Sequence, residues 1–132
     1  MKYKVIFENF AETHFIKNFV KKHKNAWDKT LRGLYVEFTF IDLLFMKTIA
    51  EIITVSDDGN LKLCKTEFKI AGTDVSRHTS GNRCIVVMDD SDVSVHVLLI
   101  YHKNDLKGNG NETNKWKELI KQHYPQYKCL LG

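Results

Sequence analysis

The first part of the chain shows a strand pattern that changes to a helix pattern. Residues 2–7 alternate between two faces with a period of two, which predicts a half-buried β-strand. From Asn9, which we expect to cap a helix, apolar residues recur every three or four positions while lysines occupy the other faces. The pattern therefore predicts a strand followed by a basic amphipathic helix.

A second helix pattern starts at Asn25, which we expect to be its N-cap. Apolar residues again recur at helical spacing: Trp27, Leu31, Leu34, Phe38 and Ile41. We expect the two helices to pair as a hairpin. Residues 43–55 are apolar without a clear period, so the sequence leaves open whether they continue the helix or form a strand.

Three further strands are predicted in the second half. Residues 64–70 alternate after a turn at 57–60, and this places Lys65, Glu67 and Lys69 on one face. Residues 72–82 have the composition of a loop. An antiparallel hairpin is predicted from residues 84–88 and 93–101, which flank the turn Asp89-Asp90-Ser91-Asp92. The second of these strands is apolar on both faces, as a central strand would be.

The last predicted element is a helix that Asn111 caps and Pro125 ends. The order of elements predicts an α+β fold, in which two N-terminal helices and a C-terminal helix pack on a small antiparallel sheet. With 132 residues, one proline and no linker-like segment, we expect residues 1–132 to form a single domain.

Charge and cysteine content narrow the class of protein only slightly. The net charge is +4, and residues 1–33 carry eight Lys/Arg against three Asp/Glu, which is compatible with a polyanionic partner. The three cysteines have no CxxC spacing and the six histidines have no HxxxH or HExxH spacing, so we predict neither a disulfide framework nor a metal site. No nucleotide-cofactor motif, signal peptide or membrane span is recognisable, and we expect a cytoplasmic protein without a cofactor.

The end of the last predicted strand carries the clearest candidate chemistry. Tyr101, His102 and Lys103 follow one another there, and Arg83 enters the preceding strand. An imidazole exchanges protons near neutral pH, and a guanidinium supplies fixed positive charge to a phosphate. If the two strands are neighbours, we expect Arg83 and His102 to converge on one phosphate group.

These residues, with the order of elements, resemble the RelE/ParE toxin superfamily. The resemblance covers most of the chain and is most specific from Ser80-Gly81-Asn82-Arg83 through Val97–Lys103 to the helix that begins at Glu112. The chain departs from the family in its greater length and in ending its last strand with Tyr-His-Lys. The greater length leaves residues 43–60 unexplained, and the different strand end leaves the exact catalytic scheme open.

The resemblance implies a toxin of a type II toxin–antitoxin system. Such a protein would cut messenger RNA on the ribosome, by attack of a ribose 2′-OH on the adjacent phosphate, and a small antitoxin protein would neutralise it. It implies catalytic roles for Arg83, His102, Lys69, Glu67 and Tyr101, and RNA contacts through Lys65, Arg77, His78 and Lys103.

Each of these residues also has a structural alternative. Lys65, Glu67 and Lys69 would form a salt-bridged face, Tyr101 would pack in the core, and the remaining cations would be solvated. Two alternative functions stay open at this point: a non-catalytic toxin of the ParE kind that inhibits DNA gyrase, and an inactive interaction protein with the same fold.

Overall fold

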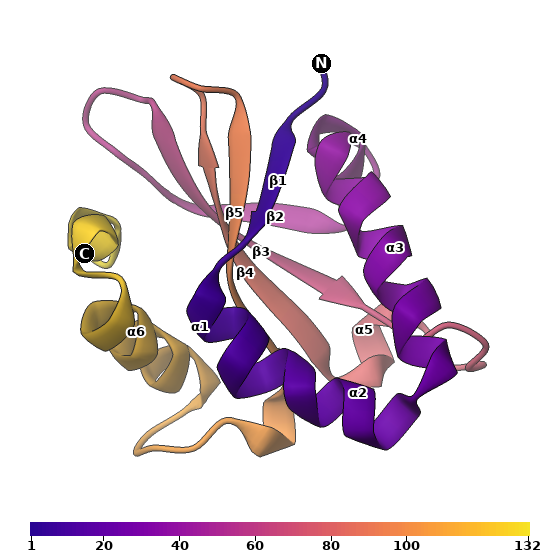
Figure 1. Ribbon diagram of the computed structural model, residues 1–132. Helices are drawn as coiled ribbons and strands as arrows, with labels where there is room; N and C mark the ends of the chain where they lie inside the picture. Colours follow the sequence, from indigo (N-terminus) through magenta and orange to yellow (C-terminus); the bar gives the residue numbers. More distant parts are fainter.

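A computed structural model describes residues 1–132, which form one five-stranded sheet with helices on both faces (Figure 1). The strands are β1 (Lys4–Phe7), β2 (Ala50–Val55), β3 (Leu61–Phe68), β4 (Asn82–Asp89) and β5 (Ser94–His102). Their order in the sheet is β1-β5-β4-β3-β2. The β4–β5 hairpin is as predicted, and β5 is an interior strand between β1 and β4.

The sheet is mixed, whereas the sequence predicted an antiparallel one. β1 runs parallel to β5, with Lys4 opposite Ser94 and Phe7 opposite Val97, and the other three pairs are antiparallel. The undecided segment 43–55 contains the end of a short helix (Ile41–Met46) and the edge strand β2. The chain therefore has five strands, one more than the sequence analysis identified.

Helical segments surround the sheet. The N-terminal ones are α1 (Asn9–Ala11), the π-helical turn η1 (Glu12–Ile16), α2 (Lys17–His23), α3 (Asn25–Thr39) and α4 (Ile41–Met46). The later ones are α5 (Arg77–Ser80), the 3₁₀ turn η2 (Lys103–Asp105), α6 (Glu112–His123) and the 3₁₀ helix η3 (Pro125–Leu130). None of them combines the length and the apolar character that crossing a membrane requires.

Both N-terminal helices begin one residue earlier than the cap predictions imply. Glu8 and Lys24, rather than Asn9 and Asn25, occupy the N-cap positions, and neither makes a side-chain capping bond. Lys24 adopts a positive φ of 48°, which turns the chain sharply between α2 and α3. The cap at Asn111 is as predicted, because its side chain accepts a hydrogen bond from the backbone N–H of Asn114 at 2.8 Å.

Aromatic side chains join α2 and α3 to one face of the sheet. The rings of Phe19 and Trp27 stack with 4.6 Å between centroids, and both contact Phe68 of β3. Full burial of each such side chain contributes about 1.5–3 kcal/mol to folding. α6 and η3 cover the opposite face, where the Tyr124 hydroxyl donates to the Leu98 carbonyl at 2.8 Å (Figure 1).

Candidate functional site

Arg83 and His102 lie on opposite faces of the sheet, so the predicted convergence is wrong. β4 and β5 are neighbours, as expected, but the register places Arg83 opposite Tyr101 and Asn82 opposite His102. Directly paired residues share a face, and successive residues of a strand alternate between faces. The sheet therefore separates the guanidinium from the imidazole.

Arg83 belongs to an ion-pair network beneath α6. Its Nε lies 3.2 Å from Glu112 Oε2, and its Nη1 lies 3.4 Å from Glu67 Oε2. Lys65 Nζ lies 3.4 Å from Glu112 Oε2, and the Tyr101 hydroxyl donates to the same oxygen at 2.8 Å. The Arg83 side chain is only 11% exposed. In this network the charges of Lys65 and Arg83 are balanced by Glu67 and Glu112, and the contacts to Glu112 attach α6 to the sheet. The buried Arg83 Nη1 and Glu67 Oε2 atoms make no hydrogen bond.

The electrostatics of this network favour a fixed structure. Burial, followed by the hydrogen bond to Glu112, raises the pKa of Tyr101 far above its usual value. Burial would raise the pKa of Glu112, but the bond from Tyr101 and the charges of Lys65 and Arg83 outweigh it and hold that pKa below its usual range. A phenol that stays protonated and a carboxylate that stays ionised do not exchange protons at neutral pH.

The remaining predicted residues are dispersed. Lys69 follows the end of β3, and its Nζ reaches the Thr73 carbonyl at 3.4 Å, so it does not extend the Lys65–Glu67 face. Arg77 pairs with Glu37 of α3, and the exposed His78 lies 3.2 Å from Glu67. Lys103 is exposed at the start of η2. Of these four, only His78 joins the network around Arg83.

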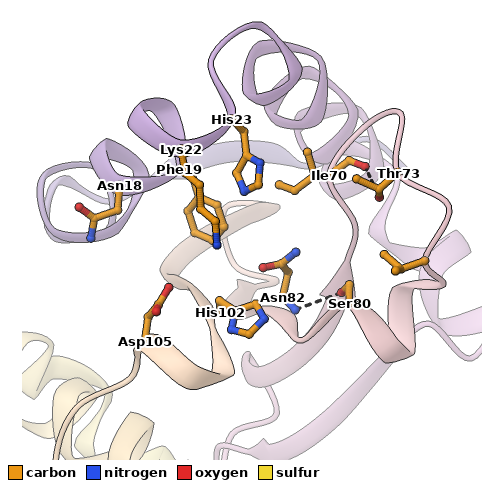
Figure 2. Close-up of a pocket in the computed structure, with 11 residues that line it drawn as sticks. Asn18, Phe19, Lys22, His23, Ile70, Thr73, Ser80, Asn82, His102 and Asp105 are labelled. Atoms are coloured by element: carbon orange, nitrogen blue, oxygen red, sulfur yellow. Dashed lines mark hydrogen bonds between the residues drawn. The ribbon is translucent and has the colours of Figure 1, made fainter.

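A cleft opens on the other face of the sheet, between α2 and the ends of β4 and β5. It has a volume of about 240 Å³. Figure 2 shows the imidazoles of His23 and His102 directed into it from different elements, with the buried Asn82 side chain between them. Polar groups also line it from α2, α5 and η2, namely Asn18, Lys22, Ser80 and Asp105.

The His102 ring is fixed on two sides. A Cβ atom placed on Gly81 would lie 2.6 Å from His102 Nε2, so only a glycine lets the ring rest against this backbone. His102 Nδ1 accepts a hydrogen bond from the backbone N–H of Asn104 at 3.1 Å. Because Nδ1 is the acceptor, Nε2 carries the proton of the neutral ring. His102 is thus held as an Nε2–H donor.

His23 has the complementary character. Partial burial, and then the neighbouring Lys22 ammonium, lower the pKa of His23 below its usual value. The neutral imidazole therefore predominates at pH 7 and can accept a proton. Lys22 is exposed beside it and lines the same cleft.

The sequence analysis did not identify His23, Asn82 or Asp105 as site residues. His23 follows two lysines on a basic helix, where the ordinary interpretation is a solvated face. The cleft forms because α2 packs over the sheet, and no local sequence pattern predicts that packing. The one available signal was the pair Gly81-Asn82, since a glycine before a strand often marks a close approach of backbone and side chain.

Comparison with known proteins yields a structural match but no sequence match. No protein-family model matches the chain, and no curated protein matches its sequence. Among solved structures, the chain is similar to a chain in the crystal structure of the archaeal RelE–RelB complex from Pyrococcus horikoshii OT3. The two chains are 16% identical in sequence, and the TM-score is 0.43. The match covers 80% of this chain and 99% of that chain. At this similarity the match assigns neither a family nor a function to the chain.

Proposed function

We propose that this protein is an endoribonuclease that cuts RNA in the cleft between α2 and the ends of β4 and β5. One observation carries the proposal: His23 and His102, 79 positions apart in the sequence, line the same cleft beside Lys22 and Asn82. A proton acceptor, a fixed N–H donor and a cation are the groups that phosphodiester cleavage through the ribose 2′-OH requires.

The two histidines take different roles in the proposed reaction. His23, neutral at pH 7, removes the proton of the 2′-OH. The 2′-oxygen then forms a bond to the adjacent phosphorus, the bond from phosphorus to the 5′-oxygen breaks, and the products are a 2′,3′-cyclic phosphate and a 5′-OH. The proton that His23 has gained is then available to the departing 5′-oxygen.

His102 acts as a hydrogen-bond donor in this scheme. With Nδ1 occupied by the Asn104 N–H, its Nε2–H is directed to a phosphate oxygen, where negative charge accumulates in the transition state. Lys22 adds positive charge at the mouth of the cleft. Loss of one such preorganised donor commonly lowers the rate by about 10²–10³.

We further propose that the RNA is a message on the ribosome, and that the protein is the toxin of a toxin–antitoxin pair. Support comes from the exposed lysines of α2 and of the α2–α3 turn, of which Lys22 lines the cleft, because such lysines would contact RNA phosphates without reading sequence. They are Lys17, Lys21, Lys22 and Lys24. An antitoxin protein would act by covering this cleft.

The test is cleavage of a defined message in a purified translation reaction, with the ends mapped by primer extension. The wild-type chain should truncate the message at the ribosomal A site. His23→Ala and His102→Ala should each reduce cleavage by about a hundredfold or more. The matched control is His78→Ala, since His78 is exposed on the other face of the sheet.

Three outcomes would contradict the proposal. Intact message at doses that arrest growth would remove the nuclease activity, and damage to DNA topology in the same cells would favour a gyrase inhibitor. Harmless overexpression would favour an inactive interaction protein. Equal loss of activity in His78→Ala and His102→Ala would show that the active site does not lie in the cleft.

A further inference from the structure

A second group of ionisable side chains lies at the turn between β4 and β5, outside the cleft. Asp89, Asp92 and His96 each offer one ligand atom, and these atoms lie within 4.8 Å of one another. Asp89 pairs with Ser94, and Val87 pairs with His96, so Asp89 and His96 project from the face that α6 and η3 cover. Asp92 reaches the same place from the turn.

Glu8 fixes the orientation of the His96 ring. The Nδ1 atom of His96 lies 2.8 Å from Glu8 Oε1, across 88 positions of sequence. A carboxylate only accepts hydrogen bonds, so Nδ1 carries a proton, and in the neutral ring Nε2 is the nitrogen that holds the lone pair. Metal-binding histidines are typically held in this way, with a carboxylate on the nitrogen that does not bind the metal.

When His96 is neutral, the Ser94 hydroxyl lies between two acceptors, Asp92 Oδ1 and His96 Nε2. The Ser94 hydroxyl lies 2.5 Å from Asp92 Oδ1 and 2.9 Å from His96 Nε2. It has one proton and can satisfy only one of these acceptors. A cation between Asp92 and His96 would satisfy both.

The charges of this group are also unbalanced. Glu8, Asp89 and Asp92 bring three carboxylates together, and no lysine or arginine forms a salt bridge with any of them. Asp90, in the same turn, is by contrast paired with Lys62 at 2.8 Å. Mutual repulsion of uncompensated carboxylates is relieved by a divalent cation.

We propose that Asp89, Asp92 and His96 bind one Zn²⁺ ion, with water completing its coordination and Glu8 orienting His96. One imidazole and two carboxylates form a mixed N/O donor set that suits this ion. Bonds of about 2.0–2.2 Å would require the ligand atoms to approach to about 3.5 Å of one another. Asp92 is exposed in a turn and can make that movement. The ion would join the β4–β5 turn to the end of β1.

Calorimetric titration of the untagged, chelator-treated chain with Zn²⁺ tests the proposal. The wild type should bind one ion per chain. Asp92→Asn should weaken binding by about tenfold or more, and Glu8→Gln by about 10–100-fold. Asp90→Asn, in the same turn, is the matched control and should bind as the wild type does. Histidine NMR spectra should show Zn²⁺ perturbing His96 Nε2.

Several results would overturn the proposal. They are absence of binding at millimolar Zn²⁺, equal affinities of Asp92→Asn and wild type, or a perturbation confined to other histidines. An imidazolium at His96 whose spectrum Zn²⁺ leaves unchanged would show that a proton occupies the place we assign to the metal. None of these results bears on RNA cleavage, because no residue of this group lines the cleft.

Discussion

The imidazole of His102 rests against the backbone of Gly81, where the smallest side chain would come within 2.6 Å of its Nε2 atom. Gly81 also has a φ of +81°, and its carbonyl accepts a hydrogen bond from the backbone N–H of Lys103 at 2.8 Å. The residue that ends α5 therefore determines where the ring at the end of β5 can lie. This relationship gives the most direct test of the cleft.

Gly81→Ala should displace the His102 ring and reduce RNA cleavage by about tenfold or more, since a misplaced donor no longer meets the transition state. The positive φ adds a loss of stability of about 1 kcal/mol. Gly72→Ala is the matched control, because Gly72 has a φ of +84° and no atom within 4 Å of an added Cβ. Thermal denaturation and cleavage rates of both variants separate backbone strain from loss of ring position. Similar activities in the two variants would contradict the role of Gly81.

Lys22→Gln should raise the pKa of His23. Burial is the larger cause of the lowered value and would persist, but the repulsion between the ammonium and the imidazolium would disappear. The proposed base must be neutral, so the acid limb of the pH–rate profile should move to higher pH in the variant. NMR titration of the His23 ring measures the shift directly. Lys21→Gln is the control and should leave the titration unchanged, since Lys22 is the charged neighbour that lowers the pKa of His23.

Glu112→Gln should flatten the dependence of stability on pH between about pH 5 and 3. The folded-state pKa of Glu112 lies below its unfolded value near 4.3, so its contribution is complete above the unfolded pKa and is lost as pH falls through the folded one. At pH 7 the variant should lose about 1–3 kcal/mol, because Arg83 and Tyr101 lose a charged partner. Urea denaturation at several pH values gives both quantities. Glu118→Gln, exposed on the same helix, should match the wild type at every pH.

The three cysteines should differ sharply in reactivity. Burial raises the pKa of Cys64 to about 12 and raises that of Cys84 well above its usual value, whereas Cys129 is exposed. Only the thiolate is alkylated, so iodoacetamide at pH 8 should label Cys129 alone in the native chain and all three cysteines in denaturant. Mass spectrometry of the digested protein identifies the labelled sites. Rapid native labelling of Cys64 would contradict the packing of the sheet.

The sequence predicted those elements whose pattern is local. The β4–β5 hairpin follows from two apolar runs around an acidic turn, and α6 follows from the Asn111 cap and the spacing that includes Trp116. The parallel pairing of β1 with β5 was not predictable, because it joins segments about 90 positions apart and leaves no periodic signal in either. The composition of residues 43–55 does not separate α4 from β2, since both elements are short and apolar.

The prediction of the candidate site was wrong at one step, the pairing of His102 with Arg83. His102 was identified correctly as a residue at a strand end, but its combination with Arg83 required the register of two strands. A shift of one residue in register reverses which face a side chain occupies, and here Tyr101, not His102, stands opposite Arg83. His23 lines the cleft only because α2 packs above the strand ends, and that packing has no local signal in the sequence.

The parallel pairing of β1 with β5 has a consequence for how the protein is made. β1 is synthesised before the other strands of the sheet, yet its partner, residues 94–97, follows about 90 positions later. Until then Val5, Ile6 and Phe7 lack a neighbouring strand, while β2, β3 and β4 can already assemble through their own turns. A nascent chain stalled before residue 94 should therefore carry an unprotected apolar terminus, a natural target for chaperones and proteases.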